Sequence, residues 1–178
     1  DAVIAQGLEA GGHRGSFLTL DMTTQTGTMA LVPRVCAAVS VPVIAAGGIA
    51  SPESIAAAMT LGAAGVQIGT AFLLCAEAKT SALHRAALKS DAAQHTALTN
   101  VFSGRPARGI VNRLVSEVGP MAATATAFPS AAGPVSLLRA AAEANGCSDF
   151  TPLWSGQNAT GCRELPAADL LRILAPVL

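Results

Sequence analysis

Three short apolar runs are spaced along the first 75 residues, and each is followed by glycine. They cover residues 2–5, 41–46 and 65–68. Short apolar runs without polar alternation are typical of strands buried on both faces of a parallel sheet. Residues 1–75 therefore predict the order strand, helix, strand, helix, strand.

The two connections in this segment carry helix signals. The first is long and polar at its start, and its apolar part predicts a helix over residues 28–39. In the second, Ser51 can cap a helix, Pro52 suits its first position and Glu53 favours its positive end. Gly62 is the expected end of that helix.

The glycines after the second and third strands form a candidate phosphate site. Gly47-Gly48 follows one strand and Gly69-Thr70 follows the next. Backbone amides at the ends of adjacent parallel strands suit a phosphate group, as in the last loops of a (β/α)8 barrel. The alternative is an ordinary pair of tight turns. Gln67 is polar within its strand, so it contacts either a ligand or a neighbouring strand.

The loop after the first strand is the candidate active-site edge. Residues 5–15 contain four glycines together with Glu9 and His13. His13 is the best catalytic candidate because imidazole titrates near neutral pH. The alternative is a loop histidine bonded to backbone. For Glu9 we favour a structural role, either orienting a loop amide or pairing with Arg14.

The rest of the chain is less regular. We expect a helical stretch over residues 76–98, irregular structure over 99–113, punctuated short helices over 114–135, helices over 134–145 and 165–178, and a loop over 151–157. The domains expected are residues 1–98, holding the βα units, and residues 99–178, an irregular and helical region. Arg105, Arg108 and Arg113 are interpreted as structural, His84 and His95 as solvated, and Trp154 as a packing anchor.

Composition removes several classes of function. The formal net charge is zero and only 12% of residues are charged, which argues against nucleic-acid binding. No apolar stretch reaches the roughly 20 residues that a membrane span needs. The four cysteines are scattered without a CxxC spacing, which favours reduced thiols over a disulfide frame or a metal site and suggests a cytoplasmic protein.

The strand count suggests an incomplete barrel. Three parallel strands cannot close an eight-stranded barrel. Because Asp1 opens directly into the first strand, we expect the chain to be a C-terminal fragment. An open sheet edge would then favour self-association.

Several motifs together resemble the C-terminal part of the nitronate monooxygenases, formerly called 2-nitropropane dioxygenases. They are AQGLEAGGHRG at 5–15, PVIAAGGI at 42–49, GVQIGTAFL at 65–73, FSGRPARG at 102–109 and LWSGQ at 153–157. The resemblance implies an α/β fold, the C-terminal part of a TIM-like (β/α)8 barrel with an adjoining small helical region. It implies FMN as cofactor, and oxidation of alkyl nitronates such as propionate 3-nitronate by O2 to a carbonyl compound and nitrite or nitrate.

The resemblance also assigns roles to individual residues. His13 would face the substrate. The FMN contacts implied are Gln6, Gly11, Gly48, Gln67, Ile68, Gly69 and Thr70. Two alternatives stay open. One is an FMN-dependent NADH enoyl-acyl-carrier or quinone reductase, because such enzymes share a similar EAGGH loop. The other is a non-catalytic fragment of such an enzyme.

Overall fold

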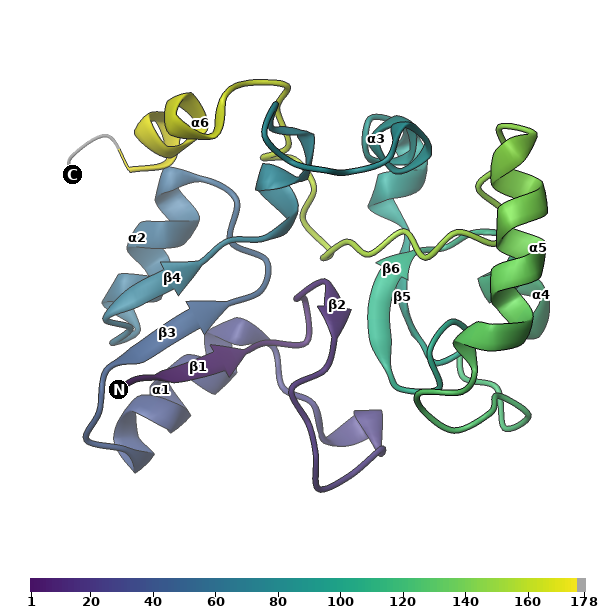
Figure 1. Ribbon diagram of the computed structural model, residues 1–178. Coiled ribbons are helices and arrows are strands. Elements are labelled where there is room, and N and C mark those ends of the chain that lie inside the picture. The colour runs from purple at the N-terminus through teal and green to yellow at the C-terminus, as the bar shows by residue number, and fades with distance from the viewer. Residues whose placement is uncertain (176–178) are drawn as a thin grey trace. The chain divides into compact units, whose positions relative to one another are not determined.

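The computed structural model describes residues 1–175, which form two compact units (Figure 1). Unit 1 comprises residues 1–10, 23–79 and 156–178, and unit 2 comprises residues 11–22 and 80–155. The chain thus crosses between units several times. The boundary predicted at residue 98 does not coincide with this division, and as a domain boundary it stays a prediction.

Unit 1 is built on a parallel sheet with the strand order β1-β3-β4. Its strands are β1 (Val3–Gln6), β3 (Val43–Ala46) and β4 (Gly65–Gln67). The helices are α1 (Thr28–Ala38), α2 (Pro52–Thr60) and α6 (Ala167–Leu174), with the 3-10 turns η1 (Met22–Thr24) and η2 (Thr70–Leu74). The predicted order of strand, helix, strand, helix, strand is confirmed, with ends shifted by one or two residues.

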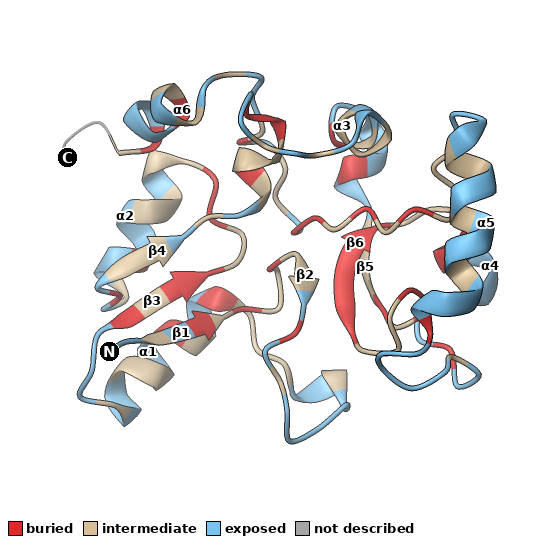
Figure 2. Ribbon diagram, in the orientation of Figure 1, coloured by how far each residue is buried: buried red, intermediate tan, exposed pale blue. Residues whose placement is uncertain are grey.

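One face of this sheet is covered by helices. Ala5, Val43 and Ala45 are buried and pack with Val32 of α1 and Ala58 of α2. Residues of the alternate positions point to the opposite face. Ile4 on that face is 55% exposed. Ala46 is buried although it lies on the same face as Ile4, so burial on that face is uneven; Figure 2 shows β3 in red and β4 mostly in tan.

The predicted start of α2 is confirmed in detail. Ser51 Oγ accepts from the Ser54 backbone N–H at 3.3 Å, and Ser54 Oγ accepts from the Ser51 N–H at 2.9 Å. Pro52 occupies the first helical position. This reciprocal arrangement satisfies two N–H groups that a helix start leaves unpaired. Gly62 follows the helix with a φ of +100°, which glycine adopts without steric cost.

Unit 2 contains an antiparallel sheet with the strand order β2-β6-β5. Its elements are β2 (Gly12–His13), α3 (Ala82–Leu88), η3 (Asp91–Gln94), β5 (Thr96–Thr99), β6 (Ala107–Ile110), α4 (Arg113–Val118) and α5 (Ala132–Ala144). All four residues of β6 are buried, and its neighbours are β2 and β5.

This sheet corrects two predictions. The helical stretch predicted over residues 76–98 is wrong beyond α3, because the chain turns at Ser90 and enters β5. The irregular structure predicted over residues 99–113 is wrong because β6 lies there. The residues of β6 read Ala-Arg-Gly-Ile, of which only Ile110 strongly favours a strand, so pairing on both sides decides the conformation. The region that follows the βα units therefore contains strands as well as helices.

The last helices agree better with expectation. The helix predicted over residues 134–145 is α5, and Gly146 follows it with a φ of +71°. The closing helix predicted over residues 165–178 is α6, which Pro166 precedes and which ends at Leu174; residues 176–178 of that prediction lie outside the described residues.

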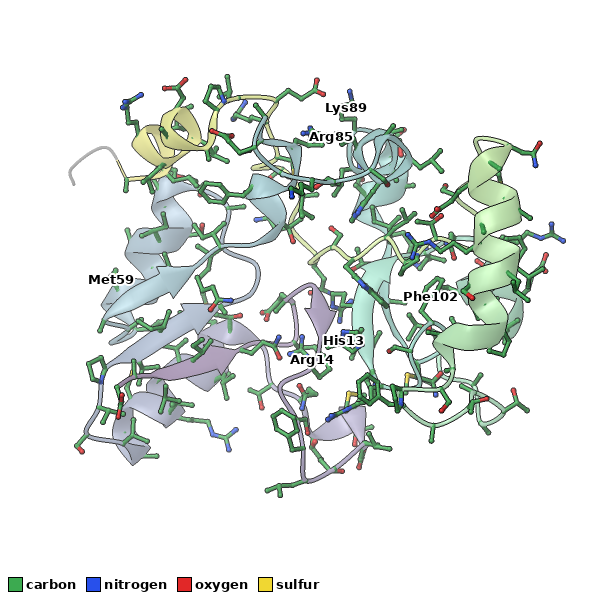
Figure 3. The ribbon with its side chains drawn as sticks, in the orientation of Figure 1. His13, Arg14, Met59, Arg85, Lys89 and Phe102 are labelled. Atoms are coloured by element: carbon green, nitrogen blue, oxygen red, sulfur yellow. The ribbon has the colours of Figure 1, made fainter. Side chains whose placement is uncertain are left out.

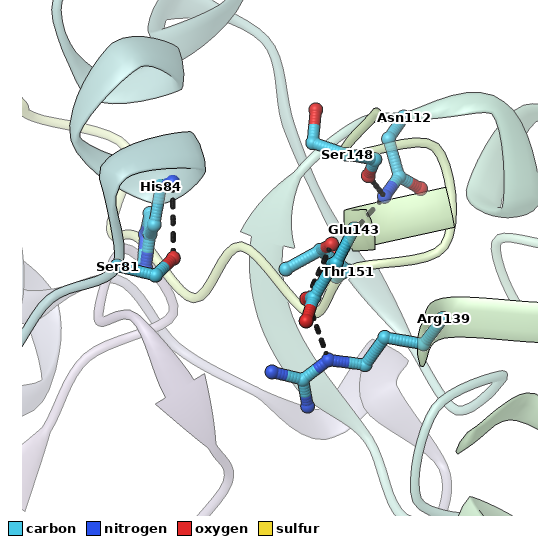
Figure 4. A network of polar contacts seen from close by, with 7 residues as sticks. All are labelled: Ser81, His84, Asn112, Arg139, Glu143, Ser148 and Thr151. Carbon is cyan, nitrogen blue, oxygen red and sulfur yellow. Dashed lines mark hydrogen bonds and ion pairs between the residues drawn. The ribbon is translucent and has the colours of Figure 1, made fainter. Parts of the chain in front are cut away.

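A polar network ties α5 to the loop that follows it (Figure 4). Arg139 Nε donates to Glu143 Oε1 at 2.7 Å, and the Thr151 hydroxyl donates to the same oxygen at 2.8 Å. These two hydrogen bonds lower the pKa of Glu143. Asn112 Nδ2 donates to the carbonyls of Ser148 and Thr151, both at 2.9 Å. The loop over residues 148–151 is therefore held from two helices.

The cysteines and the helices each give one further observation. Cys36, Cys75, Cys147 and Cys162 are free thiols, as predicted. Within the part of the chain that the structure describes, none of the helices combines the length and the apolar character that crossing a membrane requires.

Glu9 provides a test of this fold. Its carboxylate accepts from the Thr28 backbone N–H at 2.9 and 3.0 Å, at the N-terminus of α1. Glu9→Ala leaves that N–H without its acceptor, so we expect a loss of about 1–2 kcal/mol in the free energy of unfolding. Urea denaturation followed by circular dichroism measures it. Arg34→Ala, on the exposed side of the same helix, is the control and should stay within about 0.5 kcal/mol of wild type. Equal effects of the two substitutions would contradict the capping role.

Candidate functional site

The predicted site residues fall into two sets, one in each unit. Gln6, Gly48 and residues 67–70 belong to unit 1, whereas Gly11 and His13 belong to unit 2. Each set has its own supporting contacts.

In unit 1, the two glutamines share one level of the sheet. Gln6 pairs in register with Ala46, and Ala46 pairs with Gln67. Residues paired across neighbouring strands point to the same face, so both amides lie on the face opposite α1 and α2, at the carboxyl ends of the strands. Gln6 is half-buried and Gln67 is exposed. Gln67 is exposed because β4 is an edge strand of this sheet.

The glycine turn after β3 needs its glycines. Gly47 and Gly48 have φ values of +117° and +72°, a region that other residues rarely adopt. A Cβ on Gly47 would also lie 3.0 Å from the Ala10 backbone nitrogen and 2.9 Å from the Thr28 hydroxyl. After β4, a Cβ on Gly69 would meet no atom within 4 Å. The Cβ direction is therefore occupied by neighbouring atoms of unit 1 at Gly47 and is open at Gly69.

Glu9 and Thr28 lie beneath the first of these turns. The Thr28 hydroxyl is 2.8 Å from Glu9 Oε2 and 2.9 Å from the carbonyl oxygen of Gly47. A Cβ on Gly7 would overlap the Thr28 side chain, so the strand end can approach α1 this closely only with glycine. The structural role predicted for Glu9 is confirmed. It orients a backbone amide, that of Thr28.

The loop that begins within the LWSGQ motif supports both turns. Asn158 Nδ2 donates to the Gly48 carbonyl at 2.9 Å, and the Gly156 N–H donates to the Thr70 hydroxyl at 2.9 Å. The Cys162 thiol donates to the Thr70 carbonyl at 3.1 Å. Burial, and to a lesser degree the neighbouring Cys75, raises the pKa of Cys162 to about 11, so the thiol keeps its proton at neutral pH. The LWSGQ motif ends one residue before Asn158. Its position was the only sequence feature quoted above that pointed to this loop.

In unit 2, His13 lies on β2 opposite Ala107 of β6 (Figure 3). Its Nε2 is 2.8 Å from the Ser103 hydroxyl oxygen. That hydroxyl also lies 3.2 Å from the Arg105 carbonyl, which can only accept. With its single hydrogen directed there, Ser103 accepts from Nε2–H of His13. The contact therefore favours the tautomer of His13 that carries its proton on Nε2.

Two aromatic rings lie beside the His13 imidazole. The ring centroid of Trp154 is 5.4 Å away and that of Phe128 is 6.4 Å away. Trp154 also contacts Phe102 edge-to-face at 5.5 Å, so its predicted packing role is confirmed. Although the His13 side chain remains exposed, partial desolvation and then the positive charge of Arg105 lower its pKa. At neutral pH the imidazole is thus mainly uncharged.

The three arginines of the adjoining segment differ from one another. Arg108 is only 5% exposed and donates to the carbonyl and hydroxyl of Thr96, so its predicted structural role is confirmed. Arg113 forms an exposed pair with Glu117 at 2.9 Å, which is structural as well. Arg105 instead lies beside aromatic rings, with its guanidinium carbon 5.0 Å from the Phe17 centroid.

The predicted solvated position of His84 is wrong. Its Nε2 atom is buried and has no hydrogen-bond partner among the described residues. Burial lowers the pKa of His84, and a hydrogen bond with the Trp154 backbone partly opposes this shift. His84 therefore contacts the segment that carries Trp154. His95 is exposed, as predicted.

Comparison with known proteins gives a consistent result. The sequence model of a family described as nitronate monooxygenase matches residues 1–176. A nitronate monooxygenase of Pseudomonas aeruginosa is 48% identical over 179 aligned positions, covering 100% of this chain and 51% of that protein. A probable nitronate monooxygenase of Staphylococcus aureus is 41% identical, covering 96% of this chain and 48% of that protein. The chain spans about half the length of these relatives.

Comparison with solved structures gives neighbours of related kinds. A nitroalkane oxidase from Streptomyces ansochromogenes matches with a TM-score of 0.88 and 42% identity, covering 99% of this chain and 51% of that one. FabK from Thermotoga maritima matches with a TM-score of 0.75 and 30% identity, covering 99% and 53%. These neighbours are TIM-barrel enzymes, in line with the α/β structure of this chain.

The electrostatic link between Arg105 and His13 can be measured. Arg105→Gln removes a positive charge, so the pKa of His13 should rise. A pH titration of the imidazole proton resonances by NMR would report the change, with His13→Asn used to assign the signal among the three histidines. In Arg113→Gln the pKa of His13 should stay unchanged. An unchanged or lower value in Arg105→Gln would argue against the link.

Proposed function

Since the chain belongs to the nitronate monooxygenase family, we propose that it carries residues of an FMN-dependent site that oxidises alkyl nitronates with O2. Propionate 3-nitronate is a representative substrate. One nitronate and one O2 give a carbonyl compound and nitrate, whereas two nitronates and one O2 give two carbonyl compounds and two nitrites. The observation that carries the proposal, beside the family match, is the His13 imidazole held by Ser103 among aromatic rings.

We place the chain in the C-terminal part of a TIM-like (β/α)8 barrel. Support comes from the three parallel strands joined through helices in unit 1, and from glycine turns after β3 and β4. In such barrels the phosphate of a ligand commonly binds at the turns after the last two strands.

The residues of unit 1 fit a flavin phosphate and its polar chain. Backbone N–H groups at Gly48, Gly69 and Thr70 would bind the phosphate, because open glycine turns let the anion approach the amides. The Thr70 hydroxyl accepts from Gly156 and so keeps its own hydrogen for an anion. The remaining proposed FMN contacts of unit 1 are Gln6, Gln67 and Ile68. Gly11, which belongs to unit 2, is a separate proposed contact. When bound, FMN supplies the electron acceptor that protein side chains lack.

His13 would position the nitronate. A nitronate is already deprotonated at carbon, so the reaction needs no base to remove that proton. Because the pKa of His13 is lowered, a hydrogen bond from the neutral imidazole fits better than a charge interaction. For a neutral nitroalkane the same imidazole could instead act as a general base.

Oxygen uptake tests this function. The purified chain with FMN and a nitronate, without NAD(P)H, should consume O2 and release nitrite or nitrate. We expect His13→Asn to lower kcat/KM by about 100-fold or more, in the range of a lost catalytic hydrogen-bonding group. His95→Asn, an exposed histidine, should leave it unchanged. Turnover that requires NADH would favour the reductase alternative, and a flavin-loaded chain without any turnover would refute an activity of this chain alone.

A binding measurement tests the phosphate site separately. Thr70→Val keeps the side-chain shape but removes the hydroxyl, which accepts from Gly156 and would donate its own hydrogen to the phosphate. FMN affinity should therefore fall about tenfold, or roughly 1.4 kcal/mol. Quenching of FMN fluorescence on titration with protein gives the Kd. Thr60→Val, near the end of α2, is the matched control and should bind FMN as wild type does. If both variants bind FMN equally well, Thr70 does not contribute to the site.

A further inference from the structure

The position of Arg105 differs from that of the other arginines in unit 2. Its guanidinium carbon lies 5.0 Å from the Phe17 ring centroid and 5.8 Å from that of Phe128. Its Nη2 donates to the Ser16 carbonyl at 2.6 Å. No ion pair among residues 1–175 includes Arg105, in contrast to the Arg113 and Arg139 pairs. The guanidinium is thus held in place without a carboxylate partner.

Arg105 and His13 share their surroundings. Phe128 contacts both, with its centroid 6.4 Å from the imidazole and 5.8 Å from the guanidinium carbon. Ser103 also connects them, because its hydroxyl contacts His13 Nε2 at 2.8 Å and the Arg105 backbone nitrogen at 3.4 Å. The charge of Arg105 is close enough to lower the pKa of His13. A ligand at His13 therefore lies within the field of this cation.

The ligand that suits such a cation is an anion of matching geometry. A guanidinium binds a carboxylate through two parallel N–H donors, and its strength rises where aromatic rings exclude part of the water. Arg105 itself is half-buried, and the rings beside it face solvent, with Phe17 82% and Phe128 54% exposed. A single unpaired guanidinium matches one carboxylate, whereas a phosphate dianion is better matched by several donors.

We propose that Arg105 is a specificity-determining residue, which binds a carboxylate on the carbon chain of the substrate while His13 contacts the nitronate group. The site then prefers a nitronate with a second anionic group over an alkyl nitronate of the same length. This inference rests on the proposed function. It assigns no bond-making step to Arg105, only recognition of the substrate.

Ligand binding tests the assignment without turnover. Trp154 is the only tryptophan, and its ring lies 5.4 Å from His13, so its fluorescence reports ligand at this position. The two probes are propionate 3-nitronate and propyl 1-nitronate, which have three-carbon chains and differ in the carboxylate. We expect wild type to bind the first more tightly. Arg105→Gln should raise its Kd about tenfold or more and that of propyl 1-nitronate less than about threefold.

Two further variants separate recognition from structure. Arg105→Lys keeps the charge but loses the two-donor geometry, so its Kd for propionate 3-nitronate should lie between those of wild type and Arg105→Gln. Arg113→Gln removes an exposed arginine of the same unit and should leave both Kd values unchanged. Equal weakening of both probes by Arg105→Gln, or no preference in wild type, would overturn the proposal.

The outcome is distinguishable from failure of the proposed function. If wild type prefers propionate 3-nitronate and loses that preference in Arg105→Gln, but consumes no O2, the recognition role stands and the oxidation does not. If wild type oxidises both nitronates and Arg105→Gln leaves both KM values unchanged, the function stands and the role of Arg105 is refuted.

Discussion

The hydrogen bonds between Glu9 and Thr28 hold together the end of the parallel sheet in unit 1. The carboxylate accepts from the first backbone N–H of α1 and lies within reach of the Thr28 hydroxyl, which also contacts the Gly47 carbonyl. The Glu9 backbone carbonyl accepts from the Gln157 N–H at 2.9 Å. A single residue therefore links the end of β1, the start of α1, the turn after β3 and the loop at residues 156–162. Since a helix start carries unpaired N–H groups and a partial positive charge, a carboxylate is well suited to this position.

This arrangement explains why the α1 N-terminus is not itself an anion site. Glu9 already supplies the negative group there, so the phosphate that we propose is assigned to the turns after β3 and β4 instead. Those turns are supported by hydrogen bonds from Asn158 and Gly156. The proposed phosphate site thus combines a glycine backbone with a fixed frame, which limits the entropy lost on binding.

In unit 2 the two neighbouring arginines of the FSGRPARG segment have different surroundings, because only Arg108 lies within β6. Arg108 lies within β6 and is satisfied by Thr96 of β5, so it stabilises the sheet. Arg105 precedes the strand, where the chain is not paired, and its side chain contacts Phe17 and Phe128. Sequence inspection gave all three arginines one structural interpretation, since spacing alone does not show which side chains meet partners.

The sequence by itself determined the elements whose signals are local: the three apolar strands, the capped start of α2, the glycine ends at Gly62 and Gly146, and His13 as the candidate for chemistry. Capping, glycine conformation and short apolar runs act over a few residues, so they can be read along the chain. Only the tertiary structure decided that residues 107–110 form a strand, that Gln6 and Gln67 lie level across Ala46, that Asn158 supports Gly48 and that Ser103 holds His13. Each of these depends on a partner far away in sequence, and partners of that kind leave no periodic or local mark on the residues themselves.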